Sequence, residues 1–203
     1  MFITFEGIDG SGKTTQIKLL KEALKKRGLK VKVFREPGGT AVSEKIRALL
    51  LDEPFDIHPV AEMFLFTSAR AQLTAEKIWP LIKQNTIVIL DRFYDSTIAY
   101  QGYGRKLIDE QIIEEISEVA TQSLSPDITF YLKIPLEEAR RRTDNLSGDR
   151  MEKSGMEFYK RVLQGYDKLA EKHDRIKVLD STQTVRDTHE SILEILQPCL
   201  LKQ

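Results

Sequence analysis

The stretch FITFEGIDGSGKTTQ, residues 2–16, joins a short apolar run to a helical pattern through a loop with little side-chain bulk. Its spacing satisfies G-x-x-x-x-G-K-[ST] with Gly7, Gly12, Lys13 and Thr14. In such a loop, successive backbone N–H groups point at phosphate oxygens, and the lysine reaches the outermost phosphates. A glycine-rich turn without a ligand is the alternative. The strand before the loop and the helix after it favour a nucleotide-binding site.

The loop also contains one acidic residue, Asp9. Because a carboxylate repels phosphate, we expect its side chain to point away from the nucleotide, toward a second ligand. A solvated loop carboxylate is the alternative. Thr14 is placed to bind Mg²⁺. The residues expected at the nucleotide are Gly7, Ile8, Asp9, Gly10, Ser11, Gly12, Lys13, Thr14 and Thr15.

Five apolar runs rich in β-branched residues are separated by long helical patterns. The runs cover residues 2–7, 31–36, 86–92, 127–134 and 175–180. Short apolar strands alternating with helices are typical of a parallel sheet covered on both faces. The sequence therefore predicts an α/β protein with a five-stranded parallel sheet in three layers. No linker or repeat interrupts residues 1–203, so we expect a single domain.

Helical stripes of apolar residues are expected to pack on the sheet. One stripe follows Asp109, a good N-cap, and Gly28 is a plausible end for the first helix. The stripe behind Asp109, predicted to be core, comprises Ile112, Ile113, Ile116, Val119 and Ala120.

Composition argues against several classes of function. Lys plus Arg equals Asp plus Glu at 31 each, so a general nucleic-acid-binding surface is not indicated. No apolar run approaches the ~20 residues that span a membrane, and no signal peptide precedes the first strand, so a cytoplasmic protein is expected. Cys199 is the only cysteine and the three histidines are scattered, which predicts neither a disulfide framework nor a zinc cluster.

The third strand ends in Asp91 and Arg92. At the carboxyl edge of a parallel sheet, beside the first loop, these side chains reach the ligand position. Asp91 can hold Mg²⁺ through a water, and the Arg92 guanidinium can bind a phosphate near the end of the nucleotide. A buried ion pair between the two residues is the alternative.

Other arginines belong to the same prediction. Arg35 and Glu36 end the second strand in the motif REPGGT, and Arg47 lies on a following helical stretch. Phe66 and Arg70 are four residues apart on another helix, and an aromatic plane beside a guanidinium suits a nucleotide base. Taken alone, that pair reads as a core residue and a surface charge.

Residues 139–150, ARRRTDNLSGDR, combine an arginine run with a flexible loop. A segment of about residues 140–153 can close over transferring phosphates and supply charge there, as a short arginine-rich lid. A solvated charged turn is the alternative.

Taken together, FEGIDGSGKTTQ, REPGGT, FLFTSAR and DRFYDSTIAYQGYGR resemble the bacterial thymidylate kinase family, and the likeness extends over nearly the whole chain. The resemblance implies a P-loop NTPase fold and transfer of the γ-phosphoryl of ATP to thymidine monophosphate, with Mg²⁺, in the synthesis of the thymidine triphosphate. It also implies a homodimer.

The family pattern further implies individual roles. Arg92, Arg47 and Arg35 would clasp the acceptor phosphate, Asp9 would bind the sugar 3′-hydroxyl, and Glu36 would assist near the metal and sugar. Phe66 would stack on thymine, Arg70 and Gln101 would bind its edge, and Thr97 would lie near it. Tyr100 would exclude a ribose. Phe93 departs from the tyrosine or histidine often found at its position.

Family members take the catalytic arginine either from the first loop or from the lid. Gly10 follows Asp9, so the resemblance implies that the lid supplies this arginine. Arg142 is our choice, with Arg140, Arg141 and Arg150 as alternatives. Gln183, in the loop after the fifth strand, would contact adenine.

Other nucleotide-binding classes fit less well. A switch GTPase needs D-x-x-G and N-K-x-D, but Asp91 is followed by Arg92, and N-K-x-D does not occur. A different monophosphate kinase or a deoxynucleoside kinase is the nearer alternative. The latter deprotonates a sugar hydroxyl and would carry an acidic base where this chain has phosphate-binding arginines.

Overall fold

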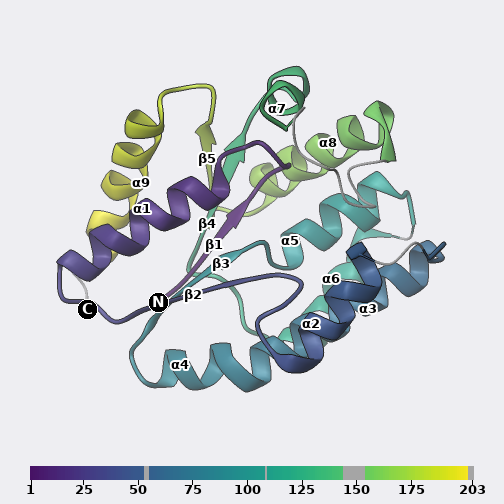
Figure 1. Cartoon of the computed structure of the whole chain (residues 1–203), viewed down its shortest axis with the longest axis horizontal. Coiled ribbons are helices and arrows are strands. Elements are labelled where there is room, and N and C mark those ends of the chain that lie inside the picture. Colours follow the sequence, from purple (N-terminus) through teal and green to yellow (C-terminus); the bar gives the residue numbers. More distant parts are fainter. Residues whose placement is uncertain (53–54, 108, 144–153, 201–203) are drawn as a thin grey trace.

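The structure, a computed structural model of the whole chain, describes residues 1–52, 55–107, 109–143 and 154–200. Its centre is a five-stranded parallel sheet in the order β2-β3-β1-β4-β5. Helices cover both faces of the sheet (Figure 1). The predicted α/β fold with a five-stranded parallel sheet is confirmed.

The strands are β1 Phe2–Glu6, β2 Val31–Arg35, β3 Ile87–Asp91, β4 Ile128–Lys133 and β5 Ile176–Asp180. The α-helices are α1 Lys13–Lys26, α2 Ala41–Arg47, α3 Pro59–Leu73, α4 Trp79–Lys83, α5 Tyr94–Thr97, α6 Glu110–Thr121, α7 Leu136–Thr143, α8 Met156–Lys172 and α9 Val185–Leu200. Three π-helical segments are η1 Ala48–Asp52, η2 Thr74–Ile78 and η3 Ile98–Gly104.

The strands at the centre of the sheet are buried almost throughout, as their apolar sequences predict. Each predicted strand nevertheless extends beyond the observed one by one residue at one or both ends. At two of these points the backbone leaves the extended conformation abruptly, with φ of 134° at Gly7 and 70° at Arg92. The first turn opens the phosphate loop, and the second directs the arginine into the site.

Helix ends follow local chemistry. Gly28 takes a left-handed φ of 79° directly after the cap of α1. The Asp109 side chain caps α6 by accepting a hydrogen bond from the Gln111 backbone N–H at 3.0 Å. The stripe behind Asp109 was only partly predicted correctly. Ile113 and Ala120 are buried, but Ile112 is 47% and Val119 81% exposed, because the helix turns that side away from the sheet.

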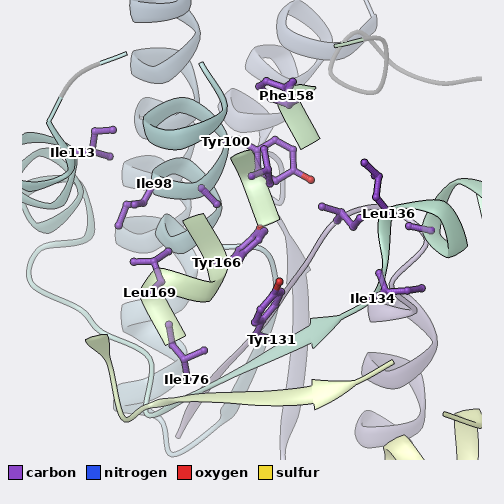
Figure 2. Close-up of a cluster of buried hydrophobic side chains, with 14 of the residues drawn as sticks. Ile98, Tyr100, Ile113, Tyr131, Ile134, Leu136, Phe158, Tyr166, Leu169 and Ile176 are labelled. Atoms are coloured by element: carbon purple, nitrogen blue, oxygen red, sulfur yellow. The ribbon is translucent and has the colours of Figure 1, made fainter. Parts of the chain in front are cut away.

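The core has a separate layer on each face of the sheet. Helices α1 and α9 pack Leu20, Leu24 and Ile192 against one face. On the other face, α8 and η3 cover the strands with a column of aromatic rings (Figure 2). Tyr131 of β4 stacks on Tyr166 at 5.0 Å between ring centroids, and Tyr166 meets Tyr100 edge-on at 6.3 Å. This column leads from the sheet to the functional cavity.

Across the part of the chain that the structure describes, we find no helix with the length and apolar character needed to cross a membrane.

Candidate active site

A cavity of about 600 Å³ lies at the carboxyl ends of β1, β2 and β3. It gathers residues from the first loop, both strand-end motifs, α3, η3 and α7. The predicted site residues that line it are Asp9, Gly10, Gly12, Lys13, Thr14, Thr15, Arg35, Glu36, Arg47, Phe66, Arg70, Asp91, Arg92, Thr97, Tyr100, Gln101, Arg142 and Gln183. Gly7, Ile8 and Ser11 are buried behind the wall, so only their backbone can contribute.

Two glycines let the chain pass close to the loop. A side-chain carbon on Gly7 would lie 2.7 Å from the Leu132 carbonyl oxygen, and one on Gly10 would lie 2.5 Å from the Ala139 carbonyl oxygen. Ala139 belongs to α7, which also carries Arg142. Gly10 therefore allows the arginine-bearing helix to pack directly on the phosphate loop.

Lys13 is held inside the loop that precedes it. Its Nζ donates hydrogen bonds to the backbone oxygens of Gly7 at 2.9 Å and Ile8 at 3.2 Å. It also lies 3.8 Å from the Asp9 carboxylate. Burial, and after it the nearby Arg92 charge, lowers the pKa of Lys13. The amine is thus buried beside another cation, which is an environment that favours contact with a polyanion.

Arg92 contacts both the first loop and the aromatic column. Its Nη2 donates to Asp9 Oδ1 at 2.8 Å, and its guanidinium lies 5.0 Å from the centre of the Tyr100 ring. The predicted alternative, an ion pair with Asp91, is wrong, because the left-handed backbone at Arg92 turns the side chain toward the first loop. Burial acts to raise the pKa of Asp9, but Arg92 and Lys13 outweigh it and lower the pKa to about 2.

Asp9 therefore pairs with Arg92 while staying 3.8 Å from Lys13. The side chain is also 40% exposed, so the carboxylate is both paired and partly solvated. One carboxylate connects the cation of the phosphate loop with the cation of the third strand end.

Arg70 and Glu36 form a buried ion pair in which Arg70 Nε donates to Glu36 Oε2 at 2.7 Å. Burial raises the pKa of Glu36 to about 7 against the opposite effect of Arg70. Arg70 is only 1% exposed, so the alternative of a surface charge at this position is wrong. Phe66 lies on the same side of α3 and is half-buried at the cavity wall.

Arg35 and Arg47 line the same end of the cavity with weaker restraints. Arg35 pairs with Glu44 at 3.2 Å, and half of the Arg35 side chain is exposed. Arg47 donates to the Pro37 carbonyl oxygen at 3.1 Å. Both side chains therefore lie at the cavity wall.

The three consecutive arginines of α7 have different surroundings. Arg142 Nη2 donates to the Ser181 carbonyl oxygen at 3.0 Å, and its Nη1 contacts the Gly10 carbonyl oxygen at 3.4 Å. Arg141 pairs with Glu138, and Arg140 contacts Met156. Arg142 lines the cavity, whereas Arg140 and Arg141 do not. Arg150 and most of the predicted lid, residues 144–153, lie outside the described residues.

Thr14 and Asp91 both line the cavity and fit a magnesium ion. Both supply oxygen atoms, which Mg²⁺ prefers, and the Asp91 carboxylate makes no hydrogen bond or ion pair with the residues described. Within the part of the chain that the structure describes, neither side chain is engaged elsewhere.

The sequence reasoning missed Glu6. This carboxylate is fully buried at the end of β1, where it accepts hydrogen bonds from the Phe93 backbone N–H at 2.7 Å and the Ser96 hydroxyl at 2.6 Å. The Tyr166 hydroxyl adds a third bond at 3.0 Å. Burial and the nearby Asp95 carboxylate raise the pKa of Glu6 to about 7. A charged residue inside an otherwise apolar strand was the available signal.

Comparisons with known proteins agree on one family. A family model described as thymidylate kinase matches residues 5–192. The chain is 46% identical over 200 residues to a thymidylate kinase of Thermoanaerobacter sp. (strain X514), covering 98% of each chain. It is 48% identical over 209 residues to one of Chlorobium phaeobacteroides, covering 97% of this chain and 94% of the relative. A crystal structure of thymidylate kinase from Ehrlichia chaffeensis matches with a TM-score of 0.81 at 36% identity, covering 97% and 98%.

Proposed function

Because this chain belongs to the thymidylate kinase family, whose members are ATP-dependent nucleoside monophosphate kinases, we propose that its cavity binds ATP and dTMP end to end. The phosphate loop takes the ATP triphosphate, and the arginines of the second and third strand ends take the dTMP phosphate. One oxygen of the dTMP phosphate bonds to the γ-phosphorus as that phosphorus leaves the β–γ bridging oxygen. The products are dTDP and ADP.

The chemical step needs charge stabilisation rather than a general base. A phosphate monoester with a second pKa near ~6 is mostly dianionic at neutral pH, so its oxygen is already nucleophilic. At ~4 Å, and with an effective dielectric constant of ~20, each pair of like charges repels by ~4 kcal/mol. Cations fixed in advance around the transferring group remove this barrier, and the fold supplies them as Lys13, Arg92 and Arg142.

On the ATP side, the backbone of residues 7–15 surrounds the phosphates and Lys13 reaches the outer ones. Arg142 approaches from α7, since it already contacts the loop at Gly10 and the chain after β5 at Ser181. Gln183 lies at the same end of the cavity and meets adenine. Mg²⁺ held by Thr14, and by Asp91 through water, would neutralise charge on the phosphates when bound.

On the dTMP side, Arg92, Arg35 and Arg47 contact the phosphate and Asp9 contacts the 3′-hydroxyl. Glu36 supports the sugar and metal region from its pair with Arg70. Phe66 stacks on the base, Arg70 and Gln101 bind its edge, and Thr97 lies beside it. Tyr100, which packs under Arg92 in the aromatic column, is assigned the role of excluding a ribose 2′-hydroxyl.

The observation that best supports this arrangement is the shared carboxylate. Asp9 Oδ1 lies 2.8 Å from Arg92 Nη2 and 3.8 Å from Lys13 Nζ, so the cations assigned to donor and acceptor are neighbours. A coupled assay of ADP release, run over a panel of nucleoside monophosphates and nucleosides, tests the proposal. We expect dTMP to be preferred over uridine and ribose counterparts. Turnover of nucleosides in place of monophosphates would contradict it.

We also propose that the protein forms a homodimer through α2, α3 and α6. These helices pack on one another along one side of the molecule (Figure 1). They expose apolar side chains, and large exposed apolar patches mark interaction surfaces. The side chains concerned are Val42, Val60, Phe64, Ile112 and Val119.

Two further expectations belong to this proposal. The chain acts as one domain over residues 1–203, with residues 140–153 as a lid that closes over the phosphates. The protein is expected to be cytoplasmic.

A further inference from the structure

Another buried carboxylate, that of Glu62 in α3, lies behind the proposed base-binding end of the cavity. Its Oε1 accepts hydrogen bonds from Gln101 Nε2 at 3.0 Å and from Arg105 Nε at 3.2 Å. Its Oε2 accepts from Arg105 Nη2 at 3.2 Å. The Arg105 guanidinium itself lies over the Phe158 ring at 4.8 Å. Glu62 is thus fixed in place from two sides.

This contact determines the direction of the Gln101 side chain. A glutamine amide has a donor end and an acceptor end, whereas an ionised carboxylate only accepts hydrogen bonds. The amide nitrogen of Gln101 must therefore face Glu62. Gln101 is 2% exposed and lines the cavity, and its amide oxygen has no hydrogen-bond partner among the described residues. The oxygen is the end that remains for a ligand.

Arg70 can offer the base only hydrogen-bond donors, whereas the free end of Gln101 is an acceptor. Its Nε donates to Glu36 and its Nη2 donates to the Phe93 carbonyl oxygen. Its Nη1 is buried and has no partner within the described part of the chain. All the nitrogens of an arginine are donors, so the polarity of this group cannot be reversed. Only the Gln101 amide can turn either its donor end or its acceptor end toward the base, so its orientation depends on a hydrogen-bond partner.

The cavity therefore presents one donor and one acceptor to the edge of a base. Thymine and uracil offer a carbonyl oxygen beside a ring N–H, which complements that pair. Cytosine offers an amino group beside a bare ring nitrogen, which has the reverse polarity. If the Gln101 amide were reversed, it would present a donor to the ring nitrogen of the base. Only Arg70 would then still distinguish thymine from cytosine.

We propose that Glu62 is a specificity-determining positioning residue, which holds the Gln101 amide oxygen toward the base and thereby disfavours cytosine. Glu62 does not touch the base and acts only through Gln101. The inference rests on the proposed binding of the monophosphate base at Arg70 and Gln101.

The test compares kcat/KM for dTMP, dUMP and dCMP in the wild type and in Glu62→Gln. Either amide orientation of Gln101 can pair with the new glutamine, so we expect the preference for dTMP over dCMP to fall about tenfold, or ~1.4 kcal/mol. The preference for dTMP over dUMP should stay the same, because these bases share the edge. An unchanged preference over dCMP would overturn the proposal, even if total activity drops.

Gln101→Met is a second variant that tests the proposal whether or not Glu62→Gln folds, and the double variant applies where Glu62→Gln folds. Gln101→Met keeps the length of the side chain and leaves the pair between Glu62 and Arg105 intact. We expect it to reduce the preference over dCMP as well, and adding Glu62→Gln to it should change the preference no further. A wild-type preference in Gln101→Met, or an additive effect in the double variant, would overturn the proposal.

Asp95→Asn is the matched control. Asp95 is also fully buried and held by an arginine fork, with both oxygens 2.7 Å from Arg175 nitrogens. This variant should lower the melting temperature without changing the preference over dCMP. An equal change in the control would show general loosening and overturn the role of Glu62. A wild type with no preference for dTMP over dCMP would instead contradict the proposed base site.

Discussion

Glu6 Oε1 accepts a hydrogen bond from the backbone N–H of Phe93 at 2.7 Å, across 87 residues of sequence. Phe93 directly follows Arg92, whose φ of 70° lies in the left-handed region. The Ser96 and Tyr166 hydroxyls, which donate to the other oxygen of Glu6, also contact the Arg92 guanidinium at 3.3 Å. A buried carboxylate thus supports both the strained backbone and the side chain of the acceptor-side arginine.

This arrangement predicts a pH-dependent stability. The pKa of Glu6 is about 7 in the folded protein against 4.5 for an ordinary glutamate, so between these values the folded state binds more protons than the unfolded state. Stability should therefore fall as the pH rises from about 4.5 to about 7. Glu6→Gln removes this pH dependence. As the pH rises across that window, the free energy of unfolding of the variant should therefore increase relative to that of the wild type by on the order of 3 kcal/mol. Urea unfolding of both proteins at pH 5 and pH 8 measures the difference.

Glu36 shifts in the same direction, but it is present in both proteins and cancels in the comparison. Asp9 shifts the opposite way and affects stability only below its ordinary pKa of 3.8. A difference between wild type and Glu6→Gln that is the same at both pH values would contradict the assignment.

Removing either central cation should abolish most turnover. Lys13→Ala and Arg92→Ala each delete a fixed positive charge where phosphate charge develops, and a loss of one such group costs roughly 100-fold or more in kcat. Steady-state ADP release measures the loss, and circular dichroism verifies the fold. Near-wild-type turnover in either variant would refute the role given to that residue.

Arg70→Ala should weaken the binding of dTMP more than the binding of ATP, because Arg70 lies in the proposed dTMP site. We expect KM for dTMP to rise about tenfold or more, while KM for ATP changes little. The variant also leaves Glu36 buried without the group that lowers its pKa, so it should lose stability relative to the wild type chiefly above pH 7, where the wild-type carboxyl is ionised and paired. That loss should shrink at lower pH, where Glu36 takes up a proton. Equal losses for the two substrates would move Arg70 out of the acceptor site.

Arg142 and Arg141 offer a matched comparison on one helix. Both contact Glu138, but only Arg142 reaches the loop and lines the cavity. Arg142→Ala should lower kcat by about 1,000-fold, as expected for an arginine that contacts the transferring group, and Arg141→Ala by less than about twofold. Single-turnover kinetics separate this step from product release. Similar losses in the two variants would leave Arg142 without a special role.

The dimer proposal is tested at Val119 and Phe64, which are 81% and 50% exposed. A charge at either position should disrupt an apolar interface, so Val119→Glu and Phe64→Glu should shift the protein from the mass of two chains to that of one in light scattering. Val178→Glu is the control, because Val178 is 49% exposed on β5, away from these helices. A wild type that already has the mass of one chain would end the proposal.

Much of the site could be read from local sequence because its geometry is local. The loop motif fixes its own backbone, and the residues that follow β2 and β3 must emerge at one edge of a parallel sheet. Lys13, Glu36, Asp91 and Arg92 could therefore be placed in one cavity before their contacts were known. The helical periodicity wrongly predicted that Ile112 and Val119 are buried. Periodicity shows which residues share a helix face, but not what packs against that face.

The sequence by itself determined the parallel α/β fold, the phosphate loop and most of the side chains that line the cavity, because short-range spacing and strand order control them. Only the tertiary structure decided the partners: Arg92 with Asp9 rather than its neighbour Asp91, Glu6 beneath Phe93, and Glu62 behind Gln101. The physical reason is that a buried charge takes the partner that folding brings within hydrogen-bond distance. Such contacts join residues tens of positions apart, where sequence spacing carries no geometric information.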